Sequence, residues 1–353
     1  MPRLPFRRAG YAPDTLATKK VEEIDHGITY PIFGDDFKKV DAVSKRLDNT
    51  VYYLISGHGG PDPGAVEKYR GKLISEDDVV KLNTYRIGFR KMLSLESERT
   101  LQPALLPPKS SHVNGIISMT LSNDKSLLEF LALCSSMVYD FLVKTIGSSN
   151  LYGNRISSLP ILEDNKYYPH LAIRTLKLNC IGEMYNSIWE KCFEDDFNLL
   201  RWSIDDRRLE TLNGEKKIAS FFKNLYTRRF ALVEIDVLTA MALGLSLDDL
   251  IEIYNIQFPI SKKFEKDTWY DQKGNIVFTP SSKTLKGVGL DRPVWNTIKD
   301  LKAGETYEHT IEKSELYKGK IVTYYAPFDK CDRVEDYKVA WAHFEEVFKE
   351  KEL

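Results

Sequence analysis

The sequence lacks the features that mark several common classes of protein. Its four cysteines form no CxxC pair, which argues against a disulfide framework or a cysteine-rich zinc site. They are Cys134, Cys180, Cys192 and Cys331. No uninterrupted apolar run reaches the roughly 18 residues of a membrane-spanning helix, and the basic N-terminus has no apolar core like that of a signal peptide. We therefore expect a cytoplasmic protein.

A global excess of basic charge is also missing. The 353 residues carry a formal net charge of -1, and the sequence pI is near 6.6. A nucleic-acid-binding role would therefore require Lys and Arg to cluster locally. What is present is an ordinary globular composition, 42% hydrophobic and 29% charged. The chain is long enough for roughly two or three domains.

The stretch from residue 84 to residue 162 carries the most informative pattern. Its first part is basic and aromatic and contains Arg86 and Arg90. An apolar run from Leu101 to Leu106 then stops at two prolines, which cannot donate to a sheet ladder, so this run predicts a strand with a defined end. A second apolar run follows at 116–121.

The same stretch continues with a predicted helix and a polar loop. Apolar residues recur at helical spacing between Ser126 and Ile146, which predicts a packing helix. The loop that follows is rich in Gly, Ser and Asn and contains side chains suited to DNA. Asn pairs with adenine, Arg pairs with guanine, and Tyr stacks on a base or wedges beside it. The candidate DNA-contacting residues are Asn150, Tyr152, Asn154 and Arg155.

The order of these fragments resembles the C-terminal target-recognition region of large Taq-like adenine-N6 DNA methyltransferases, of the kind found in bacterial restriction and phage-defence systems. In the first half the similar fragments are Arg90, Glu98-Arg99-Thr100, Pro107-Pro108, Ser111-His112, Ser135-Ser136 and Leu151 to Pro160. Further along they are Gln257-Phe258-Pro259, Trp269-Tyr270-Asp271, Gly287-Val288-Gly289 and residues 324–333. The resemblance covers roughly residues 84 to 350 and implies double-stranded DNA as the partner.

Several basic residues outside the loop are also candidates for DNA contact. Lys283, Lys286 and Arg292 flank a Gly-Val-Gly sequence and are predicted to contact phosphates. Arg86 and Arg90 are predicted to face DNA as well. For Arg99 two interpretations stay open, because it either faces DNA or pairs with a neighbouring glutamate.

The resemblance covers only the recognition half of such an enzyme. Adenine methylation needs a loop of the form Asn/Asp/Ser-Pro-Pro-Tyr/Phe to hold the flipped base. The Pro107-Pro108 pair is preceded by Leu106 and followed by Lys109, so it does not fit that role. No glycine-rich strand-to-helix turn for S-adenosylmethionine is visible either. We expect no cofactor in this chain, which would be a C-terminal piece or a split subunit whose catalytic partner binds S-adenosylmethionine.

A second interpretation concerns a Gly/Pro-rich stretch near the N-terminus. There His58 follows a short apolar run, and Glu76 lies downstream, an arrangement that resembles the first metal-binding segment of zinc-dependent N-acetylmuramoyl-L-alanine amidases. His and carboxylate ligands suit a zinc ion with an open position for water. His112 is a poor second histidine ligand because it follows a proline-containing turn. A non-enzymatic scaffold is the third interpretation.

We predict an α+β fold with four segments. They are an irregular lead-in at 1–50, a β-rich target-recognition region at 51–162, a helical region at 163–255 and a C-terminal mixed segment at 256–353. Within them, Gly244 is predicted to end one helix and Ser246 to begin the next. The turn 271–275 lies between an aromatic pair and an apolar run, which predicts a β-hairpin.

Overall fold

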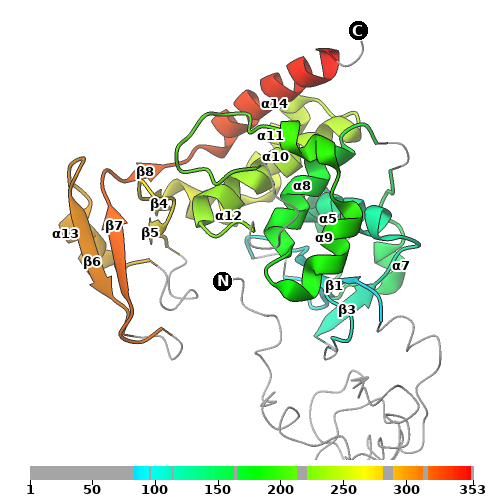
Figure 1. Cartoon of the computed structure of the whole chain (residues 1–353), viewed down its shortest axis with the longest axis horizontal. Helices are drawn as coiled ribbons and strands as arrows, with labels where there is room; N and C mark the ends of the chain where they lie inside the picture. The colour runs from blue at the N-terminus through cyan, green and yellow to red at the C-terminus, as the bar shows by residue number, and fades with distance from the viewer. Residues whose placement is uncertain are drawn as a thin grey trace, which may run out of the picture. The chain divides into compact units, whose positions relative to one another are not determined.

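The computed structural model describes residues 83–94, 97–110, 112, 115–145, 147–162, 165–212, 221–280, 289–312 and 317–350. Over these residues the fold is α+β, as predicted, and combines helices with small antiparallel sheets (Figure 1). The predicted lead-in at 1–50 lies outside the described residues.

The chain divides into two compact units. Unit 1 comprises Met1–Leu93, Pro103–Leu127 and Ser148–Ser158. Unit 2 comprises Ser94–Gln102, Leu128–Gly147 and Leu159–Leu353. The chain passes between the units several times, so their boundaries differ from those of the four predicted segments.

Unit 1 contains a three-stranded antiparallel sheet. Strand β1 (Arg86–Arg90) is central and lies between β2 (Pro103–Leu106) and β3 (Ile116–Met119). Strand β2 lies within the apolar run from which a strand was predicted, and β3 lies within the second apolar run. At the centre of β1, a Cβ atom at Gly88 would lie only 2.7 Å from a methyl carbon of Leu106. Glycine therefore allows β2 to pack tightly against β1.

Helices predominate among the described elements of unit 2, and α10 (Leu225–Ala242) is central to them. It packs against α8 (Tyr168–Asn179), α11 (Leu247–Gln257) and α14 (Arg333–Glu350). Figure 1 shows α14, in red, running beside α10. The other helices with residues in unit 2 are α5 (Asp124–Ser135), α6 (Met137–Thr145), η3 (Glu183–Tyr185), α9 (Asn186–Cys192), η4 (Asp195–Leu199), α12 (Pro259–Lys266) and α13 (Arg292–Ile298).

The prediction of one continuous helix from 126 to 146 was wrong. Helices α5 and α6 are separated at Ser136 and bent by 72°. In an unbroken helix the N–H of Met137 would bind the carbonyl of Leu133. Instead it donates to the carboxylate of Asp236 (2.7 Å), while the Ser136 hydroxyl donates to the Leu133 carbonyl (2.6 Å). Two side chains thus replace the backbone bond that would continue the helix.

The predicted end of α10 and start of α11 are confirmed. Gly244 has φ +71°, and its N–H donates to the carbonyl of Met241 at 3.0 Å. This left-handed conformation suits glycine and ends the helix. Ser246 begins α11 with a capping box, in which its side chain accepts from the Asp249 N–H and the Asp249 carboxylate accepts from the Ser246 N–H.

Two small antiparallel sheets lie in the C-terminal part of unit 2. One has the order β5–β4–β8, and the other pairs β6 with β7. The strands are β4 (Trp269–Tyr270), β5 (Ile276–Phe278), β6 (Thr306–Thr310), β7 (Ile321–Tyr325) and β8 (Asp329–Lys330). The predicted hairpin is confirmed as β4 and β5. Their aromatic core includes Trp295, whose ring stacks on Phe278 at a centroid distance of 5.8 Å.

Within the described ranges, no single helix combines the length and the apolar character needed to cross a membrane. By length and composition alone, only the bent pair α5 and α6 passes such a test. Most residues of this pair are buried in the protein, as expected of core helices.

Candidate nucleic-acid interface

The described residues of unit 1 carry a positive charge that the whole-chain composition hides. They include six Lys and Arg side chains and a single acidic one, Asp124. The basic residues are Arg86, Arg90, Lys91, Lys109, Lys125 and Arg155. An excess of one sign produces a local field that attracts polyanions. Basic side chains therefore outnumber acidic ones among the described residues of this unit.

The structure brings the basic segment after β1 next to the Gly/Ser/Asn loop. The N–H of Leu93 donates to the carbonyl of Ser149 (3.0 Å), and the N–H of Leu151 donates to the carbonyl of Lys91 (2.7 Å). These bonds flank an antiparallel bridge between Met92 and Asn150. Residues opposite each other in such a non-hydrogen-bonded pair have closely spaced side chains on the same face.

Alternation along both segments produces one outward row of side chains. On the first segment Arg90 is exposed, and Met92 is 59% exposed. On the second segment Leu151 is fully buried, whereas Tyr152 is 51% exposed. The backbone at Tyr152 is extended, with φ −116° and ψ 160°. Because extended chains alternate their faces, Tyr152 lies on the same side as Asn150.

We call Arg90, Met92, Asn150 and Tyr152 the outward row. Its chemistry combines a guanidinium, a thioether, a carboxamide and a phenol. The ammonium group of Lys91 lies 5.8 Å from the centroid of the Tyr152 ring, within the range of a cation–π contact. The row can therefore offer phosphate, base-edge and stacking contacts along one short piece of paired backbone.

A short helix, α7 (Gly153–Ile156), follows the outward row directly. Ile156 is buried at 2% exposure and anchors this helix, while Arg155 is exposed. Two of the four predicted loop residues, Asn150 and Tyr152, thus lie in the row, and Arg155 follows in the next turn. Asn154 lies in α7, and its side chain is not among those that the structure describes.

Arg86, which was also predicted to face DNA, is only 5% exposed. Its guanidinium donates to the carbonyl of Ser110 and to the hydroxyl groups of Ser110 and Ser118, both at 3.3 Å. The Ser118 hydroxyl is also 2.7 Å from Nε2 of His112. Burial lowers the pKa of Arg86. These bonds hold the Arg86 side chain within the sheet. We therefore do not count Arg86 among the residues proposed to contact DNA.

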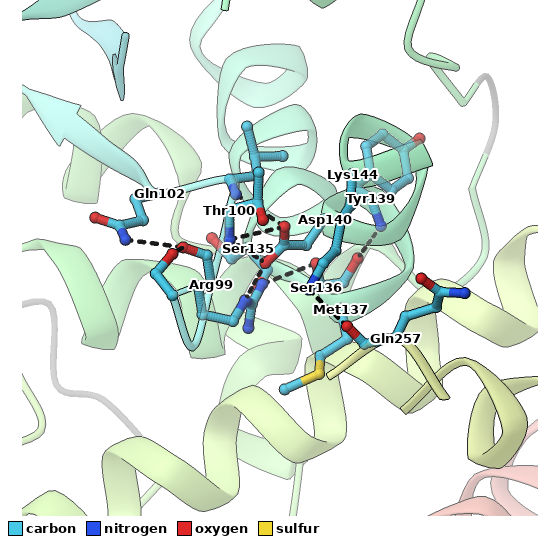
Figure 2. A network of polar contacts seen from close by, with 12 residues as sticks. Arg99, Thr100, Gln102, Ser135, Ser136, Met137, Tyr139, Asp140, Lys144 and Gln257 are labelled. Atoms are coloured by element: carbon cyan, nitrogen blue, oxygen red, sulfur yellow. Dashed lines mark hydrogen bonds and ion pairs between the residues drawn. The ribbon is translucent and has the colours of Figure 1, made fainter. Parts of the chain in front are cut away.

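Arg99 has an ion-pair partner within unit 2, the carboxylate of Asp140. Its guanidinium lies 2.7 Å from the carboxylate of Asp140 and donates to the backbone carbonyls of Ser135 and Ser136 (2.8 and 2.9 Å). Figure 2 shows how Asp140 also accepts the N–H of Thr100. This network holds the segment before β2 against the break between α5 and α6.

The remaining basic candidates belong to unit 2. Arg292 is 53% exposed, pairs with Asp267 at 2.6 Å, and lies over the ring of Phe278 at 4.2 Å. Lys283 and Lys286 lie outside the described residues.

The proposed zinc ligands His58 and Glu76 also lie outside the described residues. In the part of the chain that the structure does describe, no cluster of three or more His, Cys, Asp or Glu side chains is arranged to hold a metal ion. Comparison of the chain with models of protein families, with curated proteins and with solved structures finds no match.

Sequence reasoning missed Met92 as part of this surface. The residue follows the exposed Arg90 by two positions, which is the spacing of one strand face. That spacing alone did not identify Met92 as a surface residue, because the end of β1 was not predicted. The pairing of the segment after β1 with the Gly/Ser/Asn loop also cannot be seen in the sequence. The structure adds this residue by placing it opposite Asn150.

Proposed function

We propose that this chain recognises double-stranded DNA on behalf of an adenine-N6 DNA methyltransferase of a restriction or phage-defence system. The catalytic domain, with its S-adenosylmethionine, would be supplied outside this chain. The DNA-binding part of the proposal rests on one observation: an outward row with Arg, Asn and Tyr side chains in a unit with six basic residues and one acidic residue among those described. The methyltransferase part rests on the ordered sequence resemblance.

The roles of the residues follow from their chemistry and exposure. Arg90 and Arg155 are exposed cations and would neutralise phosphates. Asn150 would read a base edge, since a carboxamide matches the donor and acceptor pair of adenine. Its position opposite Met92 fixes its backbone, so its side chain would approach DNA from a defined direction. Tyr152 would contribute an aromatic face.

The experiment is a titration of the full chain with duplex DNA of random sequence at several salt concentrations. Each phosphate contact contributes about 0.9 to the slope of log K against log salt. The double variant Arg90→Ala/Arg155→Ala should therefore bind more weakly and lower the slope by about two. The matched control is Lys262→Ala/Lys263→Ala, which removes two exposed cations from α12 in unit 2 and should leave the slope unchanged.

Three outcomes would count against the proposal. Binding that does not depend on salt, equal losses in both double variants, or no binding by the wild-type chain would each contradict it. Metal analysis of the same sample tests the amidase interpretation. One zinc ion per chain that is lost in His58→Ala, together with absent DNA binding, would favour the amidase.

A further inference from the structure

Two large apolar side chains are exposed among the basic residues of unit 1. Within the described part of unit 1, Met92 (59% exposed) and Tyr152 (51%) are the exposed large hydrophobic residues. Both belong to the outward row, so they project from neighbouring segments on the same side. An exposed apolar group that is held in place by the fold is often a contact for a partner.

The charge around this pair indicates what kind of partner fits. Arg90 is in the same row, Arg155 lies in the helix that follows, and the Lys91 ammonium lies 5.8 Å from the Tyr152 ring. Residues 83–94 and 147–158 contain no aspartate or glutamate. Segments that carry basic and no acidic side chains attract a polyanionic partner. Apolar side chains framed by cations match the pattern of DNA-bending proteins, which insert such side chains between base steps.

The backbone around the pair is suited to this task. Wedge insertion must offset the cost of unstacking, a few kcal/mol per base step, so a wedge is more effective when its position is fixed before binding. Two backbone hydrogen bonds, of 2.7 and 3.0 Å, fix the segments that carry Met92 and Tyr152. Buried Leu151 anchors the second segment from the opposite face.

We infer that Met92 and Tyr152 form an apolar wedge that enters between stacked base pairs and bends the DNA bound by this chain. This inference rests on the proposed DNA-binding function and extends it. The cations beside the wedge contact the phosphates that flank the opened step. The wedge contributes the distortion, and the cations contribute most of the salt dependence.

The test separates distortion from binding. Random-sequence duplexes carry a fluorescent adenine analogue that brightens when it is unstacked, and a dye pair at their ends reports bending by energy transfer. The wild-type full chain should brighten the analogue and shorten the distance between the ends. Met92→Ala/Tyr152→Ala should abolish both signals and weaken binding by about tenfold per side chain, while the salt slope stays at its wild-type value.

Three further variants sharpen the result. Met92→Leu and Tyr152→Phe keep the apolar volume and should retain both signals, because insertion needs no hydroxyl group. Met184→Ala removes a side chain of similar exposure, 62%, from unit 2 and should change neither signal.

The possible failures are distinguishable. Salt-dependent binding without unstacking or bending, or normal distortion by Met92→Ala/Tyr152→Ala, overturns the wedge and leaves the proposed function standing. The absence of any salt-dependent binding overturns the proposed function and the wedge together.

Discussion

The carboxylate of Asp236 on α10 lies 2.7 Å from the guanidinium of Arg333 on α14, and both side chains are almost completely buried. The same carboxylate accepts hydrogen bonds from the Tyr337 hydroxyl and from the Met137 backbone N–H, both at 2.7 Å. One carboxylate therefore ties together three helices, α6, α10 and α14. Removing one partner of a buried pair leaves the other charge uncompensated, which is more costly than the pair is stabilising.

Replacement of Asp236 tests this role. Asp236→Ala should lower the free energy of unfolding by about 3 to 5 kcal/mol, because Arg333 loses one of its carboxylates and two donors lose their acceptor. Urea denaturation followed by circular dichroism measures this change. The control is Glu335→Ala, which breaks an exposed pair with Lys338 on α14 and should cost less than about 1 kcal/mol. Equal effects of the two substitutions would show that the buried carboxylate has no special role.

Stability should also depend on pH through Glu265. This carboxylate is 17% exposed and lies between Arg333 (2.8 Å) and Arg229 (3.1 Å). Burial by itself raises the pKa of Glu265, but the two guanidinium groups outweigh burial and lower the pKa to about 2. A carboxyl group with a lowered pKa in the folded state contributes stability above its unfolded pKa and loses it as the pH falls through the folded value.

The free energy of unfolding should therefore fall as the pH is lowered from about 4.5 to about 2, by on the order of 3 kcal/mol from this group. Glu265→Gln should be less stable at neutral pH and should show a shallower decline in that window. Burial raises the pKa of Asp236, which acts with the opposite sign, so the measurement is the difference between wild type and Glu265→Gln at each pH. Parallel curves would contradict the assignment.

Arg99 should contribute to the stability of the fold and not to DNA binding. Its guanidinium makes three bonds, to Asp140 and to the carbonyls of Ser135 and Ser136. Arg99→Ala should cost about 2 to 3 kcal/mol, and Arg99→Lys should recover only part of this, since an ammonium lacks the planar fork. Below the melting transition, the salt slope of DNA binding should match the wild-type value. A lower salt slope of DNA binding in Arg99→Ala would instead indicate that Arg99 contacts DNA.

Local signals in the sequence located much of the fold. The junction of α10 and α11 was predictable because Gly244 and Ser246 act on the turns that contain them. The hairpin of β4 and β5 was predictable for the same reason, since its turn lies directly between its strands. The break at Ser136 was not predictable from local sequence. It depends on Asp236, which is far along the chain and accepts a hydrogen bond from the Met137 N–H.

The candidate site was likewise only partly predictable from the sequence. The composition of the Gly/Ser/Asn loop identified Asn150, Tyr152 and Arg155 as candidates for DNA contact, and the structure assigns the last two to exposed positions. Arg86 and Arg90 are the same residue type on one strand, yet only Arg90 is exposed. Their difference arises from Ser110 and Ser118, which are near Arg86 only after β2 and β3 have paired with β1.

Two substitutions with opposite expected effects on DNA affinity test whether Arg292 contacts DNA. Its ion pair with Asp267 at 2.6 Å reduces the charge that it offers to a phosphate. If Arg292 contacts DNA, Arg292→Ala should lower the salt slope by about one or less, whereas Asp267→Asn should release the guanidinium and strengthen binding. Filter binding at several salt concentrations measures both. Unchanged affinity in both variants would remove Arg292 from the interface.

Packing at Gly88 links the sheet to the outward row, because Gly88 and Arg90 share strand β1. A methyl group at this position would lie 2.7 Å from a methyl carbon of Leu106, which is 3% exposed and has little room to move. Gly88→Ala should therefore lower the free energy of unfolding by about 1 to 3 kcal/mol through overpacking. Leu106→Ala should itself cost about 2 to 5 kcal/mol because it leaves a cavity. The new methyl group partly fills that cavity, so the double variant should lose less stability than the sum of the two single losses. A double-mutant cycle by urea denaturation measures the difference, and strictly additive losses would show that the two residues do not press against each other.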